Sequence, residues 1–359
     1  MNNVKIYGAG SIGNHLAQAS RRKGWDVVIA DVDSLALERT RNEIYPNRYG
    51  SWDNSIKLVD THTEDSSFYD LVIIGTPPDT HLNLAIEALK HNPIAILIEK
   101  PATSLDLTRA DELVAKAAKS NTRLFVGYDH VVSNSVKEIT ALVSKIPPEK
   151  IITIDTEFRE YWGGIFAAHP WLAGPWETYL GYSERGGGAL AEHSHALNLW
   201  QYLARISGAG RIIEVQAMLD TINDGKVKYD RLSALHLKTE NGLIGRCVQD
   251  VVTSPPKKWL SIKTIDQQYD LKFSPTVDLL YSVNGEVEKS FEKARPDDFL
   301  AELNHIESVT KQKLSSPIDF FYGLETMLVV KAAHLSSKFN KTAYIDYNKG
   351  FNDSAITLR

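Results

Sequence analysis

The six residues Gly8–Gly13 are the feature that most constrains what this chain can fold into. They read GAGSIG, which is the pattern GxGxxG, and they directly follow the short apolar run Val4–Tyr7. Residues 12–23 then carry apolar side chains at helical spacing, and Gly24 ends the pattern. The chain is therefore expected to begin with a strand, a glycine-rich turn and a helix.

Each glycine of this turn has a separate task when a dinucleotide is bound there. Gly8 permits a tight bend, Gly10 lets the backbone approach a pyrophosphate, and Gly13 lets the helix pack closely on the strand. Ser11 and Ile12 lie at the helix N-terminus, where backbone N–H groups face the anion. An ordinary glycine-rich turn is the alternative, but the strand and helix around the pattern favour a dinucleotide site.

Asp31 ends the second apolar run, Trp25–Asp31. It lies 18 residues after Gly13. In dinucleotide-binding folds, the acidic residue that binds the adenosine ribose hydroxyls lies roughly 20 residues after the glycine motif. A carboxylate there repels the 2′-phosphate of NADP, and no Arg occurs in residues 32–34. The sequence thus predicts NAD as the cofactor. The alternative for Asp31 is a solvated residue or a helix cap. Asp33 fits the cap better.

Apolar runs and amphipathic segments alternate through the first third of the chain. Further strands are expected at Tyr69–Pro77, Ile94–Pro101 and Arg123–Tyr128, and helices at 33–44, 80–90 and 104–119. This alternation predicts an α/β Rossmann domain, which is a doubly wound parallel sheet, over residues 1–127. Ligands bind at the carboxyl ends of such strands.

The remaining residues, 128–359, are expected to form an α+β domain. Segments between Ile151 and Phe273 alternate apolar and polar residues and are broken by turn sequences, which predicts a largely antiparallel open sheet. Helices at 190–205 and 319–338 can cover one face of it. The other face is left to meet substrate or another subunit.

Several motifs in order resemble the Gfo/Idh/MocA family of NAD(P)-dependent sugar oxidoreductases. They are the GxGxxG turn, TPPDTH at Thr76–His81, EKP at Glu99–Pro101, and the glycine-rich entry into a helix at Gly174–Leu203. The resemblance implies NAD binding by Thr76, Pro77, His81, Glu99 and Lys100. It also implies that Lys100 is catalytic, that the substrate is a small sugar or sugar derivative, and that the open sheet forms a homodimer or homotetramer.

His195 is the second catalytic candidate, because alcohol oxidation needs a proton acceptor and imidazole titrates near neutral pH. Glu192 lies three residues earlier, so on one continuous helix the two side chains share a face. Many relatives place Asp four residues before the histidine, which leaves the role of Glu192 open. Asn198 lies where relatives often carry an acid, and a hydrogen bond to substrate is expected there. A buried structural histidine is the alternative for His195.

Aromatic residues are dense between Tyr161 and Tyr182, where sugar faces can stack on rings. Trp176 and Tyr179 are the preferred substrate contacts, with core packing as the alternative. Tyr128, after the last Rossmann strand, and Arg159, which can face an anionic group, are further candidates.

Other classes of protein are disfavoured by composition. The net charge of −5 and the absence of a basic stretch argue against nucleic acid as a partner. Apolar runs are too short to span a membrane, and the single cysteine, Cys247, fits a cytoplasmic address. No metal is expected, because Glu192, His193 and His195 do not converge on one face of a helix.

The sequence therefore predicts an NAD-dependent dehydrogenase or reductase acting on a secondary alcohol or ketone of a sugar, sugar acid or nucleotide sugar. Two alternatives remain. One is an NAD-dependent glycosidase with the same motifs, and the other is a catalytically silent regulator that binds dinucleotide.

Overall fold

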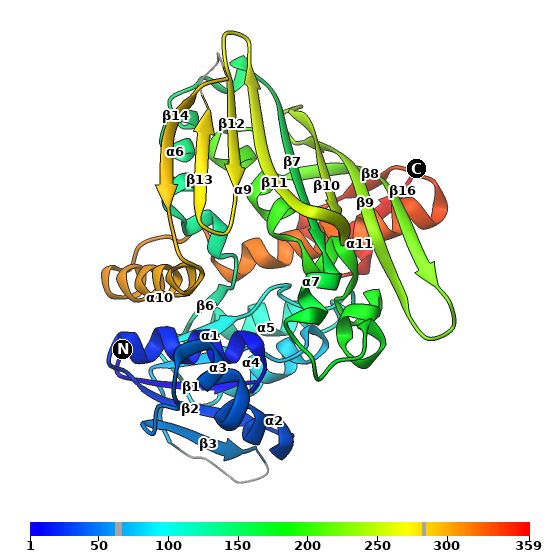
Figure 1. Cartoon of the computed structure of the whole chain (residues 1–359). Coiled ribbons are helices and arrows are strands. Elements are labelled where there is room, and N and C mark those ends of the chain that lie inside the picture. Colours follow the sequence, from blue (N-terminus) through cyan, green and yellow to red (C-terminus); the bar gives the residue numbers. More distant parts are fainter. Residues whose placement is uncertain (62–66, 282–284) are drawn as a thin grey trace.

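The computed structural model describes residues 1–61, 67–281 and 285–359, and it contains two sheets (Figure 1). The first sheet has six parallel strands in the order β3-β2-β1-β4-β5-β6. Their bounds are β1 Asn3–Tyr7, β2 Asp26–Asp31, β3 Ile56–Asp60, β4 Leu71–Ile74, β5 Ala95–Ile98 and β6 Arg123–Val126. This order changes direction between β1 and β4, so the predicted doubly wound Rossmann sheet is confirmed.

The helices of this part follow from the local sequence. They are α1 Ser11–Arg22, α2 Ser34–Arg39 with a π-turn through Ile44, α3 Tyr45–Tyr49, α4 His81–Leu89 and α5 Ala110–Ala117. Asp33 caps α2, because its side chain accepts from the N–H of Leu35. The helix expected at 104–119 begins only at Ala110, since Asp106 accepts from the N–H of Thr108 and holds the preceding residues in a turn.

The second sheet has ten strands in the order β14-β13-β12-β11-β7-β10-β9-β8-β15-β16. Its strands are β7 Ile151–Tyr161, β8 Ile212–Asn223, β9 Lys228–Thr239, β10 Ile244–Asp250, β11 Val252–Thr264, β12 Gln268–Phe273, β13 Val277–Tyr281, β14 Val287–Glu292, β15 Ala343–Ile345 and β16 Ile356–Leu358. All neighbouring pairs are antiparallel except β7 and β10. The predicted α+β part with a largely antiparallel sheet is therefore confirmed.

Helices cover one face of this second sheet (Figure 1). They include α8 Gly188–Glu192, α9 His195–Ile206 and α11 Phe320–Phe339, with α6 Asn134–Val143 beside the β12–β14 end and α7 Trp162–Ala167 following β7. Trp200 of α9 is fully buried, and its indole N–H donates to the carbonyl of Ile154 in β7 at 2.6 Å. This contact fixes α9 on the sheet and so places the residues at its N-terminal end.

Helix α10, Arg295–Gln312, was not expected from the sequence, and it joins the two parts of the chain. It packs against α1 of the first sheet (Figure 1). Lys23 pairs with Glu307 at 2.9 Å, and Arg22 pairs with Asp297 at 2.9 Å. Helix α1, which follows the glycine-rich turn, is therefore held in place by the second half of the chain.

The helix expected at 190–205 is two helices. Helix α8 ends at Glu192, and α9 begins at His195. His193 has ψ 24° and Ser194 has ψ −5°, so the backbone leaves helical geometry between them. Within the described residues no helix is both long and apolar enough to span a membrane.

Candidate active site

The glycine-rich turn has the geometry that a dinucleotide needs. Gly8 has φ +106°, and a Cβ built there would lie 2.7 Å from the carbonyl oxygen of Gly75. A Cβ on Gly13 would lie 2.0 Å from the carbonyl oxygen of Gly8, so the close approach of helix and strand requires glycine. A Cβ on Gly10 would meet no described atom within 4 Å, although Gly10 directly precedes α1. The space beside Gly10 is therefore open on the side where a pyrophosphate would lie.

The N-terminus of α1 is suited to an anion. Among the described residues no side chain caps it, and its first turn carries no acidic residue. Arg48, which sequence reasoning missed, donates to the carbonyl oxygen of Ser11 at 3.0 Å and to its hydroxyl at 2.8 Å. Arg48 belongs to no recognised motif, so the sequence gave no signal for it beyond its positive charge. Ser11 and Ile12 thus lie in a turn that favours negative charge.

Asp31 lies beside the same turn. One carboxylate oxygen accepts from the backbone N–H of Ala9 at 2.7 Å, and the other accepts from that of Asp33 at 3.0 Å. The carboxylate is therefore held at the end of β2 next to the glycines, where a ribose would lie. This geometry fits NAD and disfavours a phosphate at the ribose 2′ position.

His81 connects the two motifs that follow β4 and β5. Its ring nitrogens lie 2.8 Å from the carbonyl oxygen of Thr76 and 3.0 Å from that of Pro101. Burial lowers the pKa of His81 to about 4, so the ring is neutral at pH 7 and donates to one of the two carbonyls. His81 thereby holds Thr76 and Pro77 beside Lys100, and its expected direct contact with the cofactor stays a prediction.

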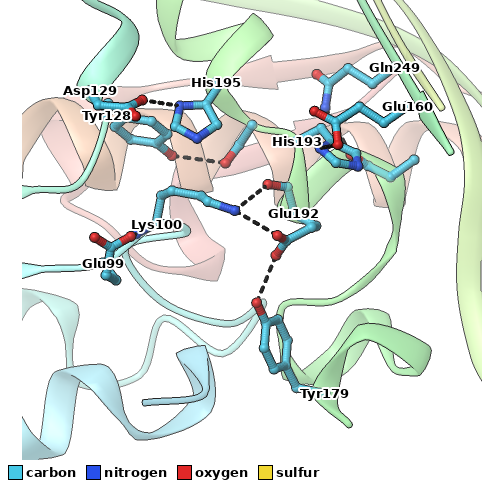
Figure 2. A network of polar contacts seen from close by, with 12 residues as sticks. Glu99, Lys100, Tyr128, Asp129, Glu160, Tyr179, Glu192, His193, His195 and Gln249 are labelled. Carbon is cyan, nitrogen blue, oxygen red and sulfur yellow. Dashed lines mark hydrogen bonds and ion pairs between the residues drawn. The ribbon is translucent and has the colours of Figure 1, made fainter. Parts of the chain in front are cut away.

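Lys100, which follows β5, is held by the second half of the chain (Figure 2). Its Nζ lies 2.6 Å from Glu192 Oε1 and 3.1 Å from the Glu192 carbonyl oxygen. Tyr179 donates to the other carboxylate oxygen of Glu192 at 2.8 Å. The side chains of Lys100 and Glu192 are only 15% and 12% exposed, so this is a nearly buried ion pair.

The pair determines the charge of Lys100. Burial alone would lower the pKa of its amine, but the contact with Glu192 outweighs burial, and the pKa lies above its ordinary value. Lys100 is thus a charged donor at neutral pH. Neighbouring Glu99 is buried, which raises the pKa of its carboxyl group to about 7, and one of its oxygens accepts from the backbone N–H of Lys100 at 3.2 Å.

His195 lies on the other side of Lys100 and belongs to a different group of contacts (Figure 2). Its Nδ1 lies 3.6 Å from Asp129 Oδ1, and the same oxygen lies 2.7 Å from Nδ1 of His130. Burial lowers the pKa of His195 well below its ordinary value, and the neighbouring His130 adds to the shift, so the ring is neutral at pH 7. Asp129 and His130 were not singled out from the sequence.

The expectation that Glu192 and His195 share one helix face is wrong. The break at His193 and Ser194 turns Glu192 toward Lys100 and His195 toward Asp129. Helical spacing predicts a common face only where the helix is continuous. Glu192 therefore acts on the lysine, and Asp129 takes the place beside the imidazole.

Of the predicted substrate contacts, Trp176 and Tyr179 lie in the short 3₁₀ turns between α7 and α8. Trp176 is 46% exposed and available to a ligand. Tyr128 is fully buried, and its hydroxyl pairs with that of Ser194 at 3.0 Å. Its position next to His195, with ring centroids 5.6 Å apart, suits support of the imidazole.

Arg159 and Asn198 make protein contacts that account for their positions. Arg159 donates to Glu157 and to the buried Asp250, each at 2.6 Å. Asn198 is buried and donates to Thr326 of α11 at 3.1 Å. Their roles toward substrate remain predictions from the sequence, and the geometry adds nothing to them.

A further polar group on β7 and β11 adjoins the same space and was missed in the sequence. Glu160 forms an ion pair with Lys258 and lies 3.7 Å from Nδ1 of His193. Glu160 and Lys258 belong to no motif, and only the pairing of β11 with β7 brings them together.

Comparison with known proteins agrees with this geometry. Residues 2–128 match the family model described as GFO_IDH_MocA, an oxidoreductase family with an NAD-binding Rossmann fold. Comparison with curated proteins by sequence gives no match.

Solved structures with the same fold are numerous. One is an oxidoreductase from Agrobacterium radiobacter in complex with NAD+, L-tartaric acid and magnesium, with a TM-score of 0.75 and 17% identity, covering 96% of this chain and 98% of that one. Another is the WlbA dehydrogenase from Bordetella pertussis in complex with NADH and UDP-GlcNAcA, with a TM-score of 0.72, 16% identity, and 96% and 98% coverage. A third is a putative myo-inositol dehydrogenase from Sinorhizobium meliloti 1021, with a TM-score of 0.73, 16% identity, and 96% and 100% coverage.

The fold and the family model together define an NAD-binding oxidoreductase. Residues 2–128 thus match the NAD-binding Rossmann domain of the Gfo/Idh/MocA oxidoreductases, and the whole chain shares its fold with the solved structures above. The resemblance that the motifs indicated, the enzyme class and NAD as cofactor are thereby confirmed.

Two glycine substitutions should separate folding from cofactor binding. Gly13→Ala places a methyl group against the Gly8 carbonyl, so we expect the free energy of unfolding to fall by about 1–3 kcal/mol. Gly10→Ala meets no described atom, so the protein should keep its stability but lose at least about tenfold in NAD affinity, or about 1.4 kcal/mol. Urea unfolding and calorimetric titration with NAD measure the two effects. Unchanged NAD affinity in Gly10→Ala would contradict the placement of the pyrophosphate.

Asp31 should set the choice between the two dinucleotides. We expect wild type to bind NAD at least about tenfold more tightly than NADP, because a 2′-phosphate would lie against the carboxylate. Asp31→Ser should reduce this ratio, while Asp33→Ser, which alters only the cap of α2, should preserve it. Titration calorimetry of the three proteins with both cofactors gives the ratio, and equal ratios in all three would remove Asp31 from the ribose site.

Proposed function

We propose that the protein transfers hydride between nicotinamide and a secondary alcohol or ketone of a sugar, sugar acid or nucleotide sugar. The observation that carries this proposal is the charged Lys100, held by Glu192, with the neutral His195 on its other side. Oxidation of an alcohol removes a hydride from carbon and a proton from oxygen. NAD supplies the hydride acceptor when it is bound, and the protein must therefore supply groups for the oxygen.

Lys100 is suited to stabilise the reacting oxygen. An ammonium group has three N–H donors, and in this site two of them point to the carboxylate and the carbonyl of Glu192. The third is available to the substrate oxygen. A fixed donor of this kind stabilises the negative charge that develops there as hydride leaves carbon.

His195 is suited to accept the proton. The ring is neutral at pH 7, and Asp129 on the Nδ1 side favours a proton on Nδ1, which leaves Nε2 as the acceptor. Lys100 cannot take this role, because its contact with Glu192 keeps it protonated. The charged Lys100 thus stabilises the developing negative charge, and the neutral His195 accepts the proton.

A sugar derivative is the proposed substrate class. Among the proteins that share the fold, WlbA is in complex with a nucleotide sugar, UDP-GlcNAcA, and another is a putative dehydrogenase of the polyol myo-inositol. Exposed Trp176 and the turn around Tyr179 offer an aromatic surface next to the Lys100–Glu192 pair.

The same proposal includes a homodimer or homotetramer in the cytoplasm. The sheet face opposite the helices carries exposed apolar side chains, namely Ile152 of β7, Met218 of β8 and Ile244 of β10. An exposed apolar sheet face of this kind is typical of a subunit interface.

Replacement of either proposed catalytic group should slow the chemical step. Lys100→Met and His195→Ala are each expected to lower kcat by about 10²- to 10⁴-fold, because one removes charge stabilisation and the other proton transfer. Stopped-flow measurement of hydride transfer tests this, with NADH affinity as the control for an intact cofactor site. Near wild-type hydride transfer in either variant would remove that residue from the mechanism.

The pH dependence should report the ion pair. In Glu192→Gln the carboxylate no longer raises the pKa of Lys100, and burial then lowers it. The charged form is therefore lost at lower pH, and the alkaline limb of kcat should move down by about one pH unit or more. Tyr179→Phe keeps the carboxylate and should leave this limb in place. Profiles of kcat between pH 6 and 10.5 that superimpose for Glu192→Gln and wild type would contradict the assignment.

Parallel assays distinguish this function from its alternatives. With a panel of sugars, sugar acids and nucleotide sugars, a dehydrogenase produces NADH in proportion to product. A glycosidase that uses NAD transiently releases a leaving group without net NADH, and a regulator binds the dinucleotide without turnover. Glycoside release without NADH would overturn the proposal.

A further inference from the structure

Asp129, His130 and His195 form a second constellation at the edge of the active site. One potential metal-ligating atom from each lies within 4.8 Å of the other two. Asp129 Oδ1 is the common partner, at 2.7 Å from His130 Nδ1 and 3.6 Å from His195 Nδ1. The chain brings these residues together from two places, since Asp129 and His130 follow β6 and His195 begins α9.

The two distances from Asp129 Oδ1, 2.7 and 3.6 Å, bracket the separation of ligand atoms in a metal centre. Ligand atoms bound tetrahedrally at about 2.1 Å from zinc lie roughly 3.4 Å apart, so small side-chain rotations would suffice. Two imidazoles and a carboxylate are a ligand set that suits zinc-type transition metals rather than calcium or magnesium. The three side chains are only 12–18% exposed, so their positions are largely fixed by packing.

The surroundings favour a cation and leave room for a fourth ligand. Glu99 and Glu302 are buried carboxyl groups that interact with Asp129, and Glu302 Oε1 accepts no hydrogen bond from the described residues. The lysines around these residues already have acidic partners: Lys100 pairs with Glu192, Lys258 with Glu160, and Lys293, which lines the same pocket as Asp129 and His130, with Asp278. Asp129 and His130 also line a small open pocket whose volume of about 10 Å³ is close to what one water molecule needs.

We propose that Asp129, His130 and His195 bind a divalent transition-metal ion of the zinc type, and that its binding inhibits the enzyme. The inhibition rests on the proposed function of His195. A metal ion on Nδ1 fixes the imidazole with its remaining proton on Nε2, so Nε2 is no longer a proton acceptor. Metal binding to Nδ1 and proton transfer to Nε2 therefore exclude each other.

The binding test uses the untagged full chain, stripped with EDTA and free of cofactor. Titration calorimetry with ZnCl₂ should show one site per chain. His130→Gln and Asp129→Asn should each weaken it by at least about tenfold, since loss of even an outer partner of a metal ligand typically costs about 10- to 100-fold. His91→Gln, which alters an exposed histidine, is the matched control and should bind zinc like wild type. Absence of binding, or equal affinity in all four proteins, would overturn the site.

The inhibition test measures hydride transfer with and without ZnCl₂ in each protein. Zinc should slow wild type and His91→Gln reversibly, with recovery on addition of EDTA, and His130→Gln should need at least about tenfold more zinc for the same fractional loss. Zinc that binds at this site without slowing hydride transfer would overturn the inhibitory role and count against His195 as the base. The calorimetry decides the metal site even if no sugar proves to be a substrate, so the two proposals can fail separately.

Discussion

The ion pair between Lys100 and Glu192 is the interaction on which the site depends. Lys100 lies just after β5 of the parallel sheet, and Glu192 ends α8 on the antiparallel sheet, so the contact joins the two halves of the chain. Both charges are nearly buried, and removal of one partner from such a pair typically costs about 3–5 kcal/mol because the other is left uncompensated. The same contact keeps the amine charged and orients it, so the architecture and the proposed chemistry share one constraint.

The break between α8 and α9 lets two residues of one short segment, Glu192 and His195, contact different parts of the active site. A continuous helix would direct Glu192 and His195 to the same side. With the break at His193 and Ser194, Glu192 lies against Lys100, whereas His195 lies against Asp129. The acidic residue therefore raises the pKa of the lysine, and burial independently lowers that of the imidazole. This separation of a charged donor from a neutral acceptor is what the proposed hydride transfer needs.

The parts of the account that depend on local sequence could be predicted, and those that depend on distant contacts could not. The glycine turn, Asp31 and Lys100 lie at or just after the ends of short apolar strands, and a parallel sheet aligns the ends of its strands, so their common location was predictable. The pairing of Lys100 with Glu192 joins residues 92 positions apart, and only the packing of the two sheets brings them together. Asp129 and His130 belong to no motif, and α10 has only a weak helical periodicity. Neither feature therefore gave a local sequence signal.

The central claim is that Glu192 keeps Lys100 positively charged at the pH of catalysis. It is tested most directly by the titration of the Lys100 side chain, followed through its ¹³Cε resonance in protein labelled with ¹³C-lysine. The resonance is assigned by its loss in Lys100→Met. The account predicts that it shows no deprotonation below pH 10 in wild type and titrates at lower pH in Glu192→Gln. A Lys100 resonance that titrates near neutral pH in wild type, or at the same pH in both proteins, would contradict the account.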